Sequence, residues 1–168
     1  MVYNNFLTSL DLKRIFAINP KWERGKTIKD SHARVVDTYN ITHKFGWLDE
    51  KVAQLVKQRN KGFRYNIKSI EETKLLRYQP GGKYDWHQDV IWDNPQHRKF
   101  TYIIQLSNSN EYSGGDFQFR DADNIDLSGL RNRGSIIIFP SIMHHRITPL
   151  TKGTRYSIVG WVVGPQWT

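Results

Sequence analysis

The segment from Arg77 to Asp89 reads RYQPGGKYDWHQD, and the predicted fold is built outward from it. Residues 79–82 have the composition of a turn, and the residues on both sides alternate as strand residues do. His87 and Asp89 stand two positions apart, so on a strand both side chains would project from one face. An imidazole beside a carboxylate supplies two thirds of a 2-His-1-carboxylate facial triad, which leaves half the coordination sphere of Fe(II) open.

Short strands separated by turns dominate the chain after residue 62. We expect strands at 63–67, 73–78, 85–92, 99–106, 115–119, 135–139, 143–148 and 156–163. The segments between them are rich in Ser, Asn, Asp and Gly, and short strands at regular intervals are typical of a β-sandwich or barrel. The sequence therefore predicts a mainly β fold with N-terminal helices (α+β).

Two helices are predicted, both in the first third of the chain. Residues 8–18 have Thr8 as a candidate N-cap and Asp11 where a capping-box acid would stand. Residues 47–62 carry an apolar stripe, acidic residues in the first turn, basic residues in the last and Gly62 at the expected end. We expect one domain over 1–168, in which 1–62 form a helical buttress and a substrate loop.

Composition limits the kinds of metal site and compartment. The chain has 168 residues, 38% of them hydrophobic, which suits one folded domain. It has no Cys, so any metal must be held by His, Asp or Glu, and an intracellular, cytoplasmic location is expected. We see no signal-peptide pattern and no run of the ~20 apolar residues that would cross a membrane.

The formal charge of +9 is concentrated in the first half of the chain. Residues 1–79 contain sixteen Lys and Arg against eight Asp and Glu, whereas residues 80–168 contain nine against eight. The basic residues are scattered singly, so a nucleic-acid surface is not favoured. Residues 24–34 form a basic stretch without periodicity, for which we expect an exposed loop.

A metal site at His87 and Asp89 needs a third ligand, and alternation helps to choose it. In the run from Ile136 to Ile147, His145 shares a face with Met143 and Ile147, whereas His144 shares the other face with Arg146. Because Arg146 prefers water, His145 should point inward. The other histidines are His32, His43 and His97.

Arg155 and Ser157 fall on one face of an otherwise apolar strand. An inward Arg is costly to bury unless it meets an anion, and its planar fork suits a carboxylate. Beside a candidate iron site, this pair predicts a pocket for a co-substrate that bears a carboxylate.

Several motifs in order and spacing resemble the Fe(II)- and 2-oxoglutarate-dependent dioxygenases, and most closely their prolyl 4-hydroxylase branch. They are Tyr84-x-x-His87-x-Asp89, Gly114-Gly115-Asp116-Phe117, Gly134-Ser135-x-x-x-Phe139-Pro140-Ser141, His145 to Ser157 in one run, and Gly160-Trp161. The resemblance spans roughly Leu75 to Trp161. Collagen-type members commonly carry Lys at the position of Arg155. An Arg at this position instead resembles the oxygen-sensing and bacterial-type members.

The resemblance implies a double-stranded β-helix (jelly-roll) core over 63–168, buttressed by two or three helices. It implies His87, Asp89 and His145 as Fe(II) ligands and O2 as co-substrate, with ascorbate as an accessory reductant. It further implies a 2-oxoglutarate pocket in which Arg155 pairs with the distal carboxylate. The other co-substrate residues would be Ser157, Tyr78 as a hydrogen-bonding tyrosine and Trp161 as a lining aromatic residue.

The function expected from this resemblance is 4-hydroxylation of a prolyl residue in a peptide or protein, with release of succinate and CO2. One alternative keeps the chemistry and changes the substrate to a free amino acid, another small molecule or a nucleobase. A second alternative is a non-catalytic basic β-barrel binding module in which the His and Asp residues are structural. We also expect the basic stretch 24–34 to close over the substrate and Trp86 to pack in the core.

Overall fold

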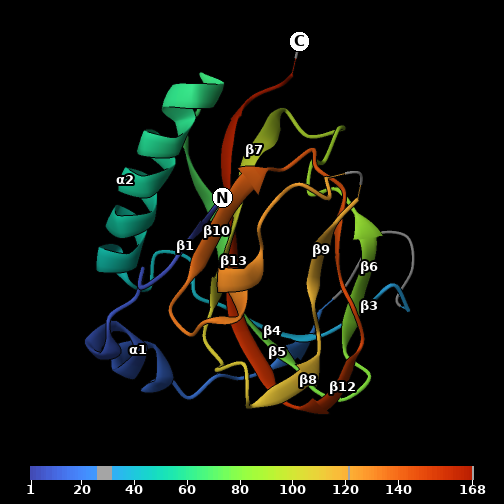
Figure 1. Ribbon diagram of the computed structural model, residues 1–168. Coiled ribbons are helices and arrows are strands. Elements are labelled where there is room, and N and C mark those ends of the chain that lie inside the picture. The colour runs from blue at the N-terminus through green and yellow to red at the C-terminus, as the bar shows by residue number, and fades with distance from the viewer. Residues whose placement is uncertain (26–31, 121, 168) are drawn as a thin grey trace.

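Two antiparallel sheets face one another in the computed structural model, which describes residues 1–25, 32–120 and 122–167 (Figure 1). The larger sheet has seven strands in the order β1 (Val2–Tyr3), β10 (Ile136–Pro140), β7 (Gln96–Gln105), β13 (Arg155–Pro165), β5 (Ser69–Tyr78), β4 (Asp37–Asn40) and β2 (Glu23–Arg24). The smaller sheet has four, in the order β3 (Arg34–Val35), β6 (Lys83–His87), β11 (His145–Ile147) and β9 (Phe117–Phe119). β8 (Tyr112–Gly114) and β12 (Leu150–Gly153) pair separately, and a short 3-10 helix, η1, covers Ser128–Arg131. The predicted mainly β fold is confirmed and is consistent with a jelly-roll core.

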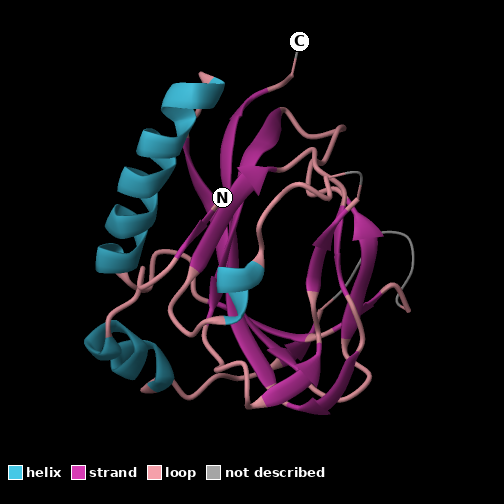
Figure 2. Ribbon diagram, in the orientation of Figure 1, coloured by secondary structure: helices cyan, strands magenta, loops and turns pink. Residues whose placement is uncertain are grey.

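Helices α1 (Ser9–Phe16) and α2 (Gly46–Phe63) lie against the face of the larger sheet that points away from the smaller one (Figures 1 and 2). Thr8 and Asp11 form the predicted capping box at the start of α1. Buried side chains from both helices, including Ile15 and Val52, pack on residues such as Ile158 of the sheet. The burial of this apolar layer fixes the helices to the sheet.

The end of α2 differs from the prediction that Gly62 would terminate it. Gly62 lies inside the helix, and Arg64 adopts the left-handed conformation with φ 56°. The side chain of Asn60 accounts for this, because it bonds both the backbone N–H and the carbonyl oxygen of Tyr65, each at 2.9 Å. That clamp fixes the chain just after the helix.

A second apolar layer fills the space between the two sheets. It includes Phe117 and Phe119 of β9, Phe139 of β10 and Val159 of β13. Alternate residues of β10 serve the two layers, since Ile136 and Ile138 face the helices while Ile137 and Phe139 face the smaller sheet. This double burial explains why the strand is a continuous apolar run.

Strands from before residue 63 also join the sheets, which corrects the expected division of the chain. β1, β2 and β4 extend the larger sheet, and β3 pairs with β6 in the smaller one. The β core therefore includes strands from before residue 63 as well as residues 63–168. Residues 26–31 of the predicted basic loop lie outside the described residues.

Two further predictions are wrong in detail. β6 ends at His87 and does not continue to residue 92. Trp86 is only half buried, and the guanidinium groups of Arg120 and Arg146 lie over its ring at 5.7 and 4.5 Å from the centroid. An aromatic ring covered by two cations at the surface satisfies the same strand pattern as a core residue.

Neither helix in the described ranges combines the length and apolar content needed to cross a membrane.

Candidate metal centre and co-substrate pocket

Three potential metal ligands meet at the end of the smaller sheet. His87 is the last residue of β6, His145 is the first of β11, and the two are paired in the strand register. Asp89 lies just beyond β6, where its backbone N–H donates to the carbonyl oxygen of Ser141 at 2.9 Å. One ligand atom from each of the three residues lies within 4.8 Å of the others.

Hydrogen bonds to backbone carbonyls orient both imidazole rings. Nδ1 of His87 lies 2.7 Å from the carbonyl oxygen of Asp85, and Nδ1 of His145 lies 2.9 Å from that of Met143. A carbonyl oxygen can only accept, so each Nδ1 carries a proton, and Nε2 is the ring atom that can bind a metal in the neutral imidazole. These Nε2 atoms face the Asp89 carboxylate at 3.5 Å for His87 and 3.4 Å for His145.

The protonation states of Asp89 and His145 match what a divalent metal requires. Burial opposes ionisation of Asp89, but His145, His87 and the Thr101 hydroxyl together hold the pKa of Asp89 below its ordinary value. Burial lowers the pKa of His145 to about 4, so its imidazole is neutral at neutral pH. A carboxylate and two neutral imidazoles are the donor set of the 2-His-1-carboxylate iron site.

Arg155, the first residue of β13, is a buried cation in the same cavity. Its side chain is only 2% exposed, and its guanidinium lies over the Tyr78 ring at 5.4 Å from the centroid. Within the described part of the chain it forms no ion pair and its Nε has no hydrogen-bond partner. The Ser157 hydroxyl, two positions along the same strand, is also buried and has no hydrogen-bond partner among the described residues. This pair fits a carboxylate ligand.

All seven residues singled out in the sequence line this one cavity. The full lining consists of Arg34, Leu76, Tyr78, Tyr84, His87, Asp89, Ile103, His145, Ile147, Arg155, Ser157, Val159 and Trp161. Burial raises the pKa of the Tyr78 phenol, which therefore keeps its proton and can donate. The indole N–H of Trp161 is buried and has no acceptor in the ranges that the structure describes, and the Arg98 guanidinium lies over the ring at 3.7 Å from the centroid.

The other described histidines that sequence analysis considered lie elsewhere. His43 pairs with Asp49 at 2.8 Å, and His97 bonds the backbone of Trp92 and Trp167. His144 is exposed, as alternation predicted.

Sequence reasoning did not predict the contacts that several residues make at the site. Thr101 and Ser141 are fully buried and hold the Asp89 carboxylate through a chain of hydroxyl groups. Tyr84 stacks on the His87 ring with 3.5 Å between centroids. The Arg34 guanidinium lies over the Tyr84 ring, at 4.9 Å from its centroid. One signal was available for Thr101, because it is a polar residue between Phe100 and Tyr102 and shares a strand face with Ile103, which packs between the sheets.

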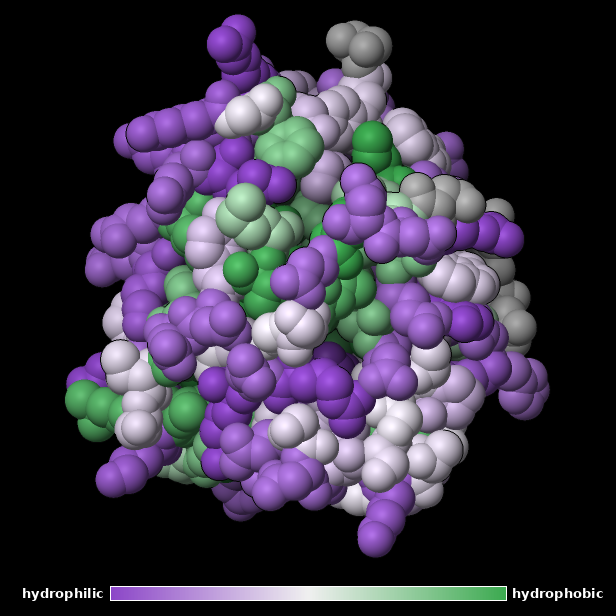
Figure 3. Space-filling model, viewed as in Figure 1, coloured by the Kyte–Doolittle hydropathy of each residue, from purple (hydrophilic) through white to green (hydrophobic). Residues whose placement is uncertain are grey.

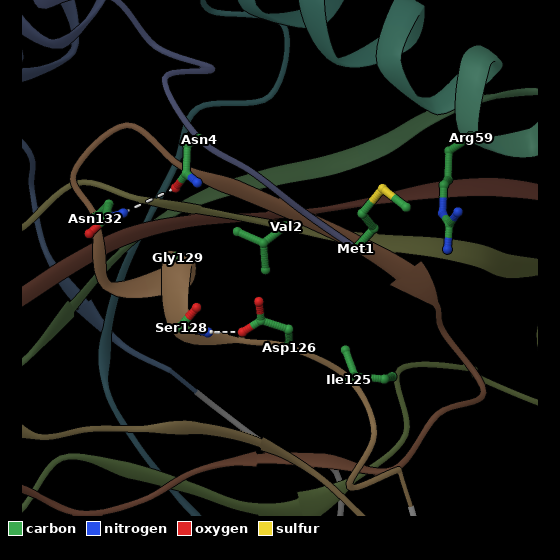
Figure 4. A pocket seen from close by; sticks show the side chains of 9 residues that line it. All are labelled: Met1, Val2, Asn4, Arg59, Ile125, Asp126, Ser128, Gly129 and Asn132. Carbon is green, nitrogen blue, oxygen red and sulfur yellow. Dashed lines mark hydrogen bonds between the residues drawn. The ribbon is translucent and has the colours of Figure 1, made fainter.

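A larger cavity of about 550 Å³ lies apart from the metal cluster (Figure 4). Its walls come from the N-terminal strand, the Arg59 side chain of α2 and residues 125–132. Two hydrogen bonds link its rim, from Ser128 N–H to Asp126 and from Asn132 to Asn4. Hydrophobic groups gather near the centre of the face that Figure 3 shows, with hydrophilic ones around them. His87, Asp89 and His145 do not line this cavity.

Comparison with known sequences identifies the family. The profile of the 2OG-Fe(II) oxygenase superfamily matches residues 73–163, more than half of the chain. The chain belongs to this superfamily. Fe(II), 2-oxoglutarate and O2 are the metal and co-substrates of its members. The donor set fits the metal, and Arg155, which has no ion pair in the described part of the chain, fits a carboxylate of the co-substrate.

Individual relatives refine this assignment. A PKHD-type hydroxylase of Crocosphaera subtropica is 30% identical over 172 residues, covering 96% of this chain and 77% of that protein. One of Idiomarina loihiensis is 32% identical over 95 residues, covering 56% of this chain and 43% of that protein. Alignments with four such relatives span 43% to 77% of the relatives' own lengths.

Solved structures share the fold of this oxygenase. A Pseudomonas putida prolyl-4-hydroxylase superposes with a TM-score of 0.74 at 18% identity, covering 100% of this chain and 92% of that one. A Trichoplax adhaerens prolyl hydroxylase, solved with a peptide fragment of hypoxia inducible factor, gives 0.75 at 20% identity and covers 98% and 83%. The fold is therefore of the prolyl 4-hydroxylase type.

Proposed function

We propose that this oxygenase hydroxylates a prolyl residue, at the 4-position, in a peptide or protein, consuming 2-oxoglutarate and O2 and releasing succinate and CO2. The observation that carries the proposal is one cavity lined by His87, Asp89, His145 and the buried Arg155, which has no counter-ion among the described residues. Such a cation is expensive to bury unless an anion belongs beside it. A purely structural His–Asp cluster, as in a binding module, would not explain it.

Each residue then has a role that follows from its position. His87, Asp89 and His145 would hold Fe(II), and their Nδ1 and carboxylate contacts would keep them aimed at the metal. Bound iron, with its co-substrate, supplies the oxidising chemistry. Arg155 and Ser157 would bind the distal carboxylate, and Tyr78 would donate a hydrogen bond to the co-substrate. Trp161 would line the pocket and help to exclude water.

Support for a peptidyl proline comes from the relatives. The similar structures include a prolyl-4-hydroxylase and a prolyl hydroxylase bound to a peptide fragment, and the sequence relatives are PKHD-type hydroxylases. We further propose that residues 1–168 act as one domain, because α1 and α2 pack on the same larger sheet that carries Arg155.

The experiment is to incubate the purified chain with Fe(II), 2-oxoglutarate, ascorbate and a library of proline-containing peptides, and to measure succinate and product mass. We expect peptides to gain one oxygen on proline, located by fragmentation, while matched peptides with alanine in place of proline gain none. Free proline, other amino acids and a methylated nucleobase form the competing arms. Oxygen gained only in those arms would replace the peptide substrate, and an absence of succinate from every arm would remove the oxygenase proposal.

A further inference from the structure

A further cavity of about 160 Å³, which we call the second cavity, shares Arg155 with the pocket of the metal cluster. It is lined by Gln105, Tyr112, Gly115, Asp116, Phe117, Leu127, Leu130, Arg131 and Arg155. Arg155 is the one residue that also lines the metal pocket. Arg155 therefore lies where the second cavity meets the metal pocket, which we have assigned to the co-substrate.

Gln105 places an unused acceptor in this second cavity. The residue is fully buried, and its Nε2 donates to the carbonyl oxygen of Ser107 and to the Tyr112 hydroxyl, each at 3.0 Å. Its Oε1 has no partner among the described residues, and neither has the Nε–H of Arg155. Oε1 of Gln105 is therefore a buried acceptor without a donor, and the Nε–H of Arg155 is a buried donor without an acceptor, on the same cavity. A buried polar group that lacks a hydrogen bond costs free energy.

Gln105 and Arg155 are also neighbours in the sheet. Gln105 of β7 is paired in register with Ser157 of β13, which lies two residues after Arg155 on the same face. Gly115 leaves space beside the arginine, because a Cβ there would lie 3.4 Å from Cδ of Arg155. The guanidinium forms no ion pair in the described ranges, and its contact with the metal pocket is the Tyr78 ring, at 5.4 Å from the centroid.

We propose that Arg155 retracts into the second cavity, where its Nε–H bonds Oε1 of Gln105, and that the oxygenase thereby also accepts 2-oxoadipate, a 2-oxo diacid with one methylene more than 2-oxoglutarate. A pocket with a fixed anchor discriminates against one methylene by about 10- to 200-fold. If Arg155 can move away from the metal, the pocket no longer discriminates between diacids that differ by one methylene. The inference rests on the proposed function, because it takes Arg155 as the residue that binds the distal carboxylate.

Binding tests the inference without turnover. The Fe(II)-loaded chain is titrated with each acid by calorimetry under nitrogen, and we expect the Kd of 2-oxoadipate to lie within about tenfold of that of 2-oxoglutarate. A larger ratio overturns the inference while leaving the proposed function in place. Failure to bind either acid overturns the proposed function itself. In an activity assay, 2-oxoadipate would release glutarate and CO2 in place of succinate and CO2.

Two variants test the route through the second cavity. Leu127→Phe adds bulk at a half-buried position of its wall, and Gln105→Leu removes the acceptor. Each should raise the ratio of the two Kd values by about tenfold, because Arg155 loses either its space or its partner. Leu10→Phe, at an exposed position of α1, is the matched control and should leave the ratio unchanged. A ratio that neither cavity variant shifts would contradict the retraction.

Discussion

The Thr101 hydroxyl donates a hydrogen bond of 2.7 Å to Oδ2 of Asp89, in the buried space behind the candidate metal centre. A hydroxyl has one proton, so the 2.9 Å contact between Thr101 and Ser141 must have Ser141 as its donor. The backbone N–H of Asp89 in turn donates to the carbonyl oxygen of Ser141. Together these bonds fix a carboxylate that lies beyond the end of its strand.

Thr101→Val therefore tests how far the hydroxyl relay orients the metal ligand. Valine keeps the shape and removes the donor, so we expect Fe(II) affinity to fall by about 10- to 100-fold with the fold intact. Anaerobic titration with Fe(II) measures the affinity, and circular dichroism checks the fold. Thr151→Val, at an exposed position of β12, is the control. Equal affinity in the two variants would show that Asp89 needs no such support.

Adjacent histidines offer a second test, because alternation separates their roles. His145 is 3% exposed and faces Asp89, whereas His144 is exposed to water. We expect His145→Ala to abolish stoichiometric Fe(II) binding and succinate formation, since two ligands remain. His144→Ala should retain both within about twofold. Metal content after anaerobic loading is the measurement, and loss of iron in the His144 variant would contradict the assignment of faces.

Arg155 should lower the stability of the chain when no co-substrate is bound. Replacing it with Met removes a buried cation that has no ion pair in the described part of the chain, so we expect the free energy of unfolding to rise by about 1–3 kcal/mol. Urea denaturation measures this difference. Arg146→Met, at the half-buried Arg146 that bonds Gln118, is the control and should give no gain.

The same variant should lose the response to 2-oxoglutarate. A ligand at 100 times its Kd stabilises the protein that binds it by about 2.7 kcal/mol, which raises Tm. We expect that rise in the unsubstituted protein loaded with Fe(II) and none in Arg155→Met. An equal rise in both would place the carboxylate elsewhere.

Period-2 alternation was the strongest sequence signal for which residues the structure brings together. It placed Arg155 and Ser157 on one face and selected His145 over His144, and the structure brings these residues into one cavity. Alternation depends only on local backbone geometry, so it survives without knowledge of the tertiary fold. Asp89 shows its limit, because β6 ends at His87 and a contact with Ser141, distant in sequence, positions the carboxylate.

The sequence did not predict features that depend on residues distant along the chain. The pairing of β1 with β10 and of β3 with β6 joins short segments whose own sequences carry little strand signal. Trp86 has a strand pattern that suits the core, but two arginines from other segments cover it at the surface. In each case the tertiary context, and not the local pattern, decides the outcome.

The capping box of α1 gives a prediction that does not depend on the metal centre. The backbone N–H of Thr8 donates to the Asp11 carboxylate at 2.9 Å, and Nζ of Lys51 lies 2.8 Å from the same oxygen. Burial raises the pKa of Asp11, but the bonds from Lys51 and Thr8 outweigh it and the net pKa is lowered. Folding therefore favours the ionised form of this carboxyl.

Asp11→Asn should destabilise the protein by about 1 kcal/mol at pH 7, because the amide carries no charge for Lys51 and is a poorer acceptor for Thr8. A lowered folded-state pKa stabilises the protein above the unfolded value of about 3.9 and stops doing so as pH falls through the folded value. The difference between the two proteins should therefore shrink in acid. Urea unfolding from pH 7 to pH 3 measures it, with Asp93→Asn as an exposed control that should show no such trend. A difference that stayed constant across this range would mean that the carboxyl of Asp11 stabilises α1 by its shape and not by its charge.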